Sequence, residues 1–150
     1  MKIAIACDHA AFNLKNGIAQ HLRECGHEVT DYGIHENVAV DYPDYAILVA
    51  EAVSEGRAER GILICGTGIG MSIAANKVKG VRCALCSDTF SAHATREHND
   101  ANMLAFGERV VGAGLAQDIV DTFINTPFSG AARHEGRIAK ITAIENKYFK

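Results

Sequence analysis

The sequence predicts an α/β protein, a three-layer sandwich whose largely parallel sheet carries helices on both faces. Five short apolar runs, several rich in β-branched residues, alternate with longer segments whose apolar residues recur every three or four positions. Strands that alternate with helices form βαβ units, whose right-handed crossovers give a parallel sheet covered on both faces. No repeat, low-complexity stretch or linker divides the 150 residues, so we expect one domain, residues 1–150.

The strands and the first two helices are expected in alternation. The first helix carries Leu14, Ile18 and Leu22 at i+4 spacing and ends at Gly26, a residue type common just after a helix. The second spans residues 45–53 and ends at a glycine in the same way. The runs with strand character lie at residues 2–7, 28–32, 61–65, 81–85 and 102–106.

Two helices follow the last expected strand. Apolar residues from Leu115 to Ile124 predict one helix, which ends before Pro127. The final helix comes after Pro127 and Gly130, so we expect it to form an arm added to the core. Four residues share one face of that arm: Ile138, Ile141, Ile144 and Tyr148.

Composition and charge exclude several classes of protein. Hydrophobic residues make up 48% of the chain and the formal net charge is −3, which gives no overall attraction to nucleic acid or an anionic membrane. The first residues turn polar too soon for a signal peptide, and no apolar run is long enough to span a membrane. Five cysteines, an odd number, sit mostly in strand-like surroundings, which favours reduced thiols. We therefore expect a cytoplasmic protein.

Ligands of parallel α/β sheets bind beyond the carboxyl ends of the strands. The positions just past these ends hold chemically active residue types. They are Asp8 and His9, residues 33–42, residues 65–70, Ser87, Asp88 and residues 107–109.

The most informative stretch is the expected strand 61–65, which delivers Cys65 into the turn Gly66-Thr67-Gly68-Ile69-Gly70 at the start of a helix. Glycines let the backbone approach a ligand, and helix N-terminal N–H groups favour negative charge. The same field would favour a thiolate at Cys65, whose reference pKa is about 8.5. The stretch predicts an anion site beside a base or nucleophile.

Other interpretations of this turn are weaker but stay open. The turn lacks the spacing and the lysine of a phosphate-binding Walker loop. Gly66 and Gly68 fit the first two glycines of a dinucleotide fingerprint, and Asp88 lies near the distance of its acidic residue, but Met71 occupies the third glycine position. A purely structural glycine turn is the remaining interpretation.

One pair of cysteines and one pair of histidines have spacings that do not require a redox or metal-binding role. Cys83 and Cys86 have redox-motif spacing but fall in a strand run, so we interpret them as inert thiols. His93 and His98 are five residues apart and do not share a helix face, so we expect no metal site.

Several polar residues have both a structural and a functional interpretation. Asp8 is a plausible helix cap, or it binds a sugar hydroxyl or phosphate together with His9. Residues 96–100 form a polar helix end, in which a histidine next to an asparagine can also move protons. Arg133 and Arg137 share a face of the arm, which is either solvated or, with an arginine at position 109, binds phosphate. An arm that crosses to another subunit would make a dimer necessary for activity.

Taken together, these motifs resemble the type B ribose-5-phosphate isomerases, in the family that includes the galactose-6-phosphate isomerase subunits. The resemblance covers nearly the whole chain. It implies a five-stranded parallel, Rossmann-like sheet and a homodimer with active sites at the subunit interface. The matching segments are 7–9, 41–43, 64–70, 72–77, 98–102, 106–109 and 133–137.

The resemblance also implies a role for each candidate residue in an enediolate mechanism without a cofactor or a metal. Cys65 would move the proton between C1 and C2, and the amides of Gly66, Gly68, Ile69 and Gly70 would stabilise the developing oxyanion. Thr67 would assist ring opening or contact oxygens, His98 would open the furanose ring, and Asn99 would hold the reacting oxygens. Asp8 and Tyr42 would bind sugar hydroxyls, while the phosphate would be held by His9, Arg109, Arg133 and Arg137.

The expected reaction is the interconversion of ribose 5-phosphate and ribulose 5-phosphate, with no nucleic acid or membrane partner. One alternative is a six-carbon substrate, allose 6-phosphate or galactose 6-phosphate, because pocket depth cannot be read from these residues. Another is a nucleotide or sugar-phosphate binding module without catalysis. The proton-transfer groups Cys65 and His98 favour the isomerase. Whether two or four subunits assemble does not follow from the sequence.

Overall fold

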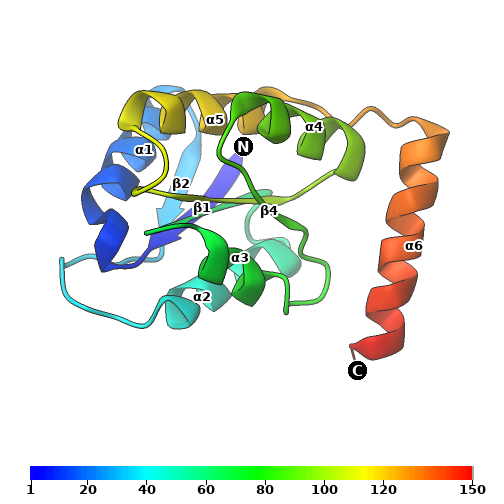
Figure 1. The fold of residues 1–150 in the computed structure, drawn as a ribbon, viewed down its shortest axis with the longest axis horizontal. Coiled ribbons are helices and arrows are strands. Elements are labelled where there is room, and N and C mark those ends of the chain that lie inside the picture. The colour runs from blue at the N-terminus through cyan, green and yellow to red at the C-terminus, as the bar shows by residue number, and fades with distance from the viewer. Residues whose placement is uncertain (150) are drawn as a thin grey trace.

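The computed structural model of this protein describes residues 1–149 and has the α/β architecture that the sequence predicts (Figure 1). Five parallel strands form one sheet in the order β2-β1-β3-β5-β4. The strands are β1 (Lys2–Cys7), β2 (Glu28–Asp31), β3 (Arg60–Cys65), β4 (Cys83–Leu85) and β5 (Met103–Gly107). The helices are η1 (His9–Ala11), α1 (Phe12–Glu24), α2 (Tyr42–Ser54), α3 (Ile69–Ala75), α4 (Thr89–Asn99), α5 (Ala113–Asn125) and α6 (Ala132–Tyr148).

Helices cover both faces of the sheet. In Figure 1, α1, α4 and α5 lie on one side of the sheet, and α2 and α3 lie on the other. Each side has its own apolar core: the first includes Ile5, Ile62 and Phe123, and the second includes Val49 and Leu63. The central strands β1, β3 and β5 are buried on both faces, which explains why their sequences are nearly continuous apolar runs.

The strand ends agree with the predicted ranges to within two residues. The largest difference is at β4, where residues 81 and 82 were expected to belong to the strand. The Arg82 N–H instead donates to the side-chain Oδ1 of Asn102 at 2.8 Å, and the Val81 N–H closes a turn on the Val78 carbonyl at 3.2 Å. These amides are thus used outside the sheet, and the strand begins only at Cys83.

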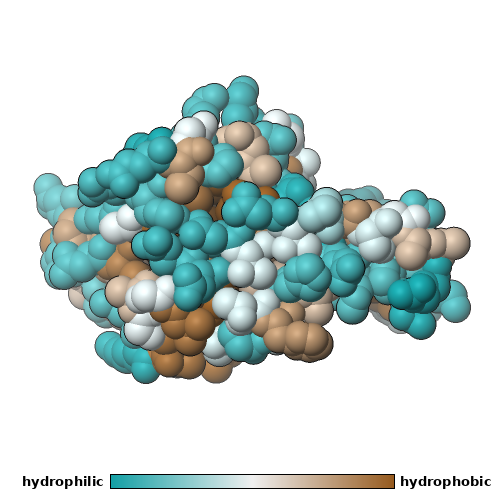
Figure 2. Space-filling model, turned by 90° about the horizontal axis from the view of Figure 1, so that it is seen from above, coloured by the Kyte–Doolittle hydropathy of each residue, from teal (hydrophilic) through white to brown (hydrophobic). Residues whose placement is uncertain are grey.

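The last helix, α6, stands apart from the body, as the sequence predicts (Figure 1). Its only buried residue is His134, near its first turn. Ile141, Ile144 and Tyr148 are 45%, 60% and 67% exposed, and they line a groove of about 460 Å³ between the arm and the body. Seen from above, the arm projects from the body, and apolar surface gathers along one flank of the molecule (Figure 2). Three large apolar side chains exposed together on a free helix indicate a surface that packs against another part of a protein.

Within residues 1–149, every helix is too short or too polar to cross a membrane.

Candidate active site

Three neighbouring strands end side by side at the carboxyl edge of the sheet. Cys7 pairs with Ile64, and Cys65 pairs with Gly107, so the residues after β1, β3 and β5 meet at one place. Asp8 is only 8% exposed there, and its Oδ1 accepts a hydrogen bond from the Ala10 N–H at 3.0 Å. This confirms the predicted helix cap, which also fixes the carboxylate at the edge of the site.

Cys65 sits at the end of β3, 5% exposed, with the glycine-rich turn folded around its sulfur. The Gly68 N–H donates a hydrogen bond to Cys65 Sγ at 3.0 Å. Gly68 has φ of +79°, a left-handed conformation that favours glycine, and it is the N-cap of α3. The Thr67 hydroxyl oxygen accepts from the Ile69 N–H at 3.2 Å. The turn therefore directs one N–H group, that of Gly68, toward the thiol.

Two larger side chains lie directly against the turn, at the positions where it has no side chain. A Cβ on Gly66 would lie 3.3 Å from Nη1 of Arg109, and a Cβ on Gly70 would lie 2.5 Å from Cζ of Tyr42. The Arg109 N–H also donates to the Gly66 carbonyl at 3.1 Å. The structure thus brings a guanidinium and a phenol to the same turn as Cys65, as the sequence-based site requires.

His9 is held at this edge through a loop that a buried lysine anchors. The Val40 N–H donates to His9 Nδ1 at 3.3 Å, so Nδ1 is unprotonated and Nε2 carries the proton as a free donor. The loop begins at the Lys15–Asp31 ion pair, in which the two charged atoms are 2.5 Å apart. Lys15 is 1% exposed and also donates to the Ile34 carbonyl at 2.9 Å. Sequence analysis missed this lysine, because its burial depends on an aspartate sixteen residues away.

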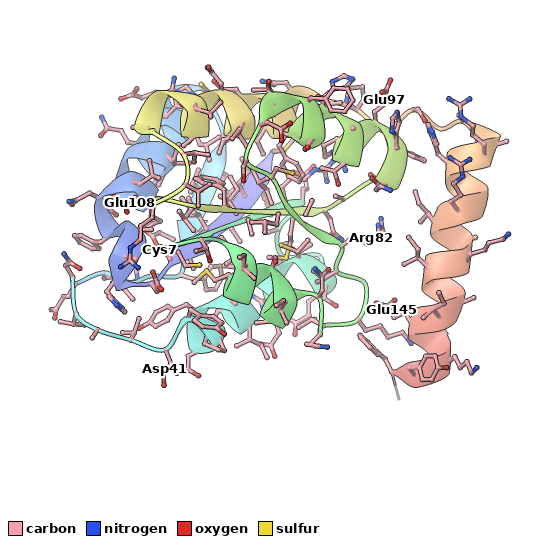
Figure 3. All side chains as sticks on the ribbon, viewed as in Figure 1. Cys7, Asp41, Arg82, Glu97, Glu108 and Glu145 are labelled. Carbon is pink, nitrogen blue, oxygen red and sulfur yellow. The ribbon has the colours of Figure 1, made fainter. Side chains whose placement is uncertain are left out.

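The remaining candidates lie at the opposite edge of the sheet. His98 and Asn99 end α4, just before β5 begins at Met103. A strand rises about 3.3 Å per residue, so the five residues of β5 separate the two edges by about 13 Å. In Figure 3, Glu97 and Arg82 lie near α6, whereas Cys7, Glu108 and Asp41 lie at the other end of the molecule. The structure therefore does not bring His98 or Asn99 to Cys65 within one chain.

Arg133 and Arg137 lie one turn apart on α6, on the same side of the molecule as His98. The rings of His98 and His134 have centroids 4.5 Å apart, which ties the start of α6 to the end of α4. The candidate residues thus form two clusters. The carboxyl-edge cluster contains Asp8, His9, Tyr42, residues 65–70 and Arg109, and the amino-edge cluster contains His98, Asn99, Arg133 and Arg137.

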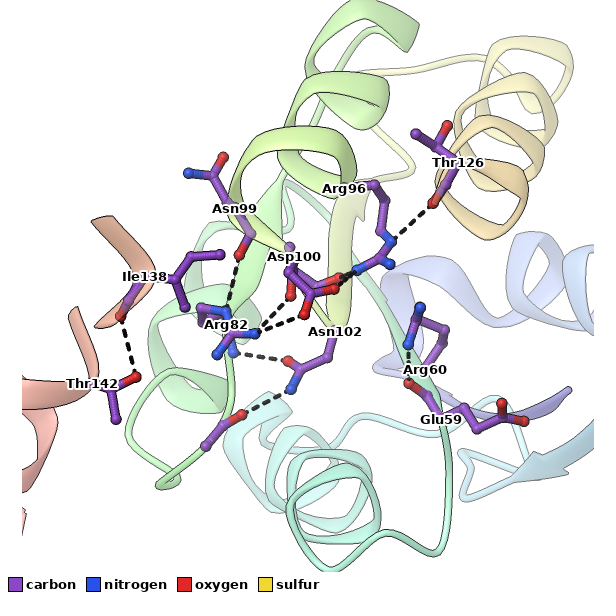
Figure 4. Close-up of polar contacts among 12 residues, drawn as sticks. Glu59, Arg60, Arg82, Arg96, Asn99, Asp100, Asn102, Thr126, Ile138 and Thr142 are labelled. Atoms are coloured by element: carbon purple, nitrogen blue, oxygen red, sulfur yellow. Dashed lines mark hydrogen bonds and ion pairs between the residues drawn. The ribbon is translucent and has the colours of Figure 1, made fainter. Parts of the chain in front are cut away.

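A network of two arginines and one aspartate fixes the backbone of the amino-edge cluster (Figure 4). The Asp100 carboxylate lies 2.8 Å from Nη1 of Arg96 and 3.5 Å from Nη2 of Arg82. Arg82 donates to the Asn99 carbonyl at 3.0 Å, and Arg96 donates to the Ala101 carbonyl at 2.6 Å. Arg96 is 2% exposed, although its sequence indicated only a polar helix end. Hydrogen bonds to the carbonyls on both sides of Asp100 define where α4 ends.

Burial keeps three other thiols protonated. It raises the pKa of Cys83 to about 12, with a smaller contribution from Cys86, and the pKa of Cys86 to about 11, with a smaller contribution from Asp88. Burial likewise raises the pKa of Cys7 to about 11. These thiols are therefore not ionised at neutral pH, in agreement with the interpretation of Cys83 and Cys86 as inert. Throughout residues 1–149, no three His, Cys, Asp or Glu side chains are grouped so that they could hold a metal ion.

A Rossmann-like sheet whose carboxyl edge carries a thiol, a glycine-rich turn and a guanidinium is the arrangement of an α/β isomerase of phosphorylated sugars. Comparison with known proteins makes this specific. The chain belongs to the Ribose/Galactose Isomerase family, whose sequence profile matches residues 3–141.

Known relatives are similar to this chain both in sequence and in structure. Ribose-5-phosphate isomerase B of Escherichia coli is 52% identical over 146 residues, covering 97% of each chain. The structure of ribose-5-phosphate isomerase B from Clostridium thermocellum superposes with a TM-score of 0.96 at 57% identity, covering 99% of both chains. The enzyme of the same name from Mycoplasma genitalium, solved with bound ribulose-5-phosphate, has a TM-score of 0.94 at 42% identity and covers 97% of both.

Proposed function

We propose that this chain interconverts ribose 5-phosphate and ribulose 5-phosphate through a cis-enediolate. The observation that carries the proposal is the placement of Cys65 Sγ, 3.0 Å from the Gly68 amide, on a turn against which Arg109 and Tyr42 lie. A base, an oxyanion site and a phosphate-binding group are what aldose–ketose isomerisation needs. Membership of the Ribose/Galactose Isomerase family supports the same reaction.

In the proposed mechanism, Cys65 acts as the base. Once the sugar is open, the thiolate removes the proton from C2 of the aldose, and the electron pair forms the C1–C2 double bond of the enediolate. The carbonyl oxygen becomes an oxyanion, which the amides of residues 66–70 stabilise. The hydroxyl proton of O2 then passes to O1, the thiol returns its proton to C1, and the carbonyl is left at C2. Thr67 contacts the reacting oxygens, and Asp8 and Tyr42 bind the hydroxyls.

The substrate phosphate is held away from the reacting carbons, and this binding orients them against the thiol. His9 offers its Nε2–H and Arg109 its guanidinium from the carboxyl edge. Arg133 and Arg137 complete the phosphate site from α6 of a second subunit. Arginine suits this role because its planar donors pair with two phosphate oxygens at once.

Because the two clusters of one chain lie at opposite edges of the sheet, we propose that the active protein is a homodimer. The amino-edge cluster of one subunit, with His98 and Asn99, then completes the carboxyl-edge cluster of the other. The exposed face of Ile141, Ile144 and Tyr148 supplies apolar area for the contact. The free cysteines fit the reducing environment of the cytoplasm, where we place this protein.

Proton NMR of ribose 5-phosphate with the purified protein in heavy water tests the reaction. We expect ribulose 5-phosphate to appear with deuterium at C1 and no added cofactor. The Cys65→Ala variant should lose turnover and keep substrate affinity, whereas Cys25→Ala, at an exposed surface cysteine, should behave as wild type. A Cys65→Ala protein with near-normal kcat would disprove the assignment of the base.

Galactose 6-phosphate is the alternative substrate, because the family description includes galactose. The same NMR experiment with galactose 6-phosphate and allose 6-phosphate separates the alternatives. Turnover of a six-carbon substrate with none of ribose 5-phosphate would replace our proposal. If no sugar phosphate reacts, a binding module remains, and binding of NAD or ATP would support it.

A further inference from the structure

The imidazole of His98 rests on that of His134 at the junction of α4 and α6. The two ring centroids are 4.5 Å apart and the ring planes are tilted by 37°. The His98 side chain is 46% exposed, whereas His134 is 4% exposed. His134 therefore covers one side of the His98 ring and is itself packed in the protein.

His134 is in turn fixed by Ser129, in the connection that precedes α6. Ser129 Oγ lies 2.7 Å from His134 Nδ1 and accepts a hydrogen bond from the Ala131 N–H at 3.2 Å. Because the hydroxyl oxygen already accepts from Ala131, its hydrogen is available to be donated to Nδ1. His134 thus has a defined ring orientation.

The same connection is also attached to the end of α4. The Ser129 N–H donates to the Glu97 carbonyl at 3.1 Å, and the Glu97 carboxylate lies 3.1 Å from His98 Nε2. His98 is therefore held from two directions, by Glu97 next to it in sequence and by His134 across the junction. Within residues 1–149, the Nδ1 atom of His98 makes no hydrogen bond to another protein group.

Burial and the nearby positive groups both favour the neutral form of the His134 ring. Burial lowers its pKa, and so do the positive groups Arg133, His98 and Arg137, while Glu97 opposes them. A neutral ring beside His98 adds no positive charge when His98 accepts a proton. Ring stacking can thus orient His98 without opposing proton transfer.

We propose that His134, oriented by Ser129, is a positioning residue for His98 in the opening of the sugar ring. The inference rests on the proposed isomerase function. An exposed histidine at a helix end would otherwise sample several rotamers, and a displacement of about 1 Å is enough to cost about 100-fold in rate. The stacked ring and Glu97 hold the imidazole in one orientation, with Nε2 at the Glu97 carboxylate.

The two substrates of the reaction separate ring opening from enediolate chemistry. Ribose 5-phosphate is a furanose, closed between C1 and O4, and must open before C2 can lose its proton. Ribulose 5-phosphate has its carbonyl at C2 and its O5 blocked by phosphate, so it cannot form a furanose and stays open. Exchange of its C1 proton with heavy water therefore needs Cys65 but not ring opening.

The experiment compares these two rates in His134→Ala and Ser129→Ala, with His27→Ala as a matched control. His27 lies just before β2, at the other end of the sheet from β4, and its Nδ1 is 3.4 Å from the amino-terminal nitrogen of Met1. For His134→Ala we expect kcat with ribose 5-phosphate to fall about 10- to 100-fold. KM and the C1 exchange of ribulose 5-phosphate should stay within about twofold of wild type. The kcat of Ser129→Ala should lie between those of wild type and His134→Ala. His134→Phe, which keeps a ring, should have a higher kcat than His134→Ala.

Three results would overturn the inference. An unchanged kcat in His134→Ala would show that His98 needs no support. A parallel loss of isomerisation and C1 exchange would show a general disturbance of the site, and a rise in KM alone would show that His134 serves only the phosphate arginines. Failure of the proposed function looks different, because wild-type protein would then neither isomerise ribose 5-phosphate nor exchange the C1 proton.

Discussion

Gly68 is the residue of the turn at 66–70 whose replacement has the most predictable consequence. Its φ of +79° is a left-handed conformation, which costs about 1–2 kcal/mol for a residue with a Cβ. A Cβ there would also lie 2.7 Å from both Cα and the carbonyl carbon of Phe106 and 2.7 Å from Cδ1 of Leu85. The Phe106 atoms are backbone of a central strand and cannot move aside, so overpacking adds about 1–3 kcal/mol.

We therefore expect Gly68→Ala to destabilise the protein by about 2–5 kcal/mol. At about 2–4 °C per kcal/mol for a chain of this size, Tm should fall by about 4–20 °C. To relieve the contact the turn must move, and the Gly68 N–H then leaves Cys65 Sγ, so kcat should fall at least about tenfold. Thermal unfolding by circular dichroism and a coupled isomerase assay measure the two effects.

Gly17→Ala is the matched control, since it makes the same chemical change inside α1. A Cβ on Gly17 meets nothing within 4 Å, and its backbone is helical. Alanine should therefore stabilise the helix by about 0.5–1 kcal/mol and leave kcat unchanged. A Gly68→Ala protein that melts within about 2 °C of wild type and keeps its kcat would refute the reasoning, because neither strain nor contact would then be present.

Three further predictions concern buried charge and protonation. Lys15→Met should reduce the free energy of unfolding in urea by about 3 kcal/mol, because Asp31 loses the partner of a buried ion pair; a loss below about 1 kcal/mol would contradict this. At pH 8, iodoacetamide should label the exposed Cys25 and leave Cys83 unmodified in native protein, since the pKa of Cys83 is raised to about 12; mass spectrometry of labelled peptides checks this. The lowered pKa of His134 means that the unfolded chain takes up its proton first as pH falls below about 6.5, so stability should decline from there, and His134→Phe should flatten that decline in urea midpoints measured from pH 7.5 to 5.

Much of the fold follows from patterns that are local in the sequence. The apolar runs of β1, β3 and β5 are nearly continuous because both faces of each strand are buried, and that burial is visible in composition alone. The arm was recognisable from the proline and glycine before α6 and from the single apolar face of that helix. The turn after Cys65 was recognisable because three glycines at alternate positions directly follow an apolar, strand-like run.

The buried charges could not be predicted. Lys15 and Arg96 are among the most buried side chains of the protein, yet each lies in a segment that looks amphipathic and solvated. Their burial depends on partners outside their own helices. Lys15 pairs with the Asp31 carboxylate, and Arg96 donates to the Thr126 and Ala101 carbonyls. A polar residue type gives no local signal of such pairing, because desolvation is offset only when distant groups supply the hydrogen bonds.

The sequence by itself determined the α/β class, the order of strands and helices and the chemical identity of the site residues, since each depends on local periodicity or on residue type. The tertiary structure decided which of these residues meet. It places Cys65 with Tyr42 and Arg109, and it places His98 at the other edge of the sheet, because α4 runs antiparallel to the strands it connects. Proximity is a property of packing between distant segments, and only the folded chain specifies that packing.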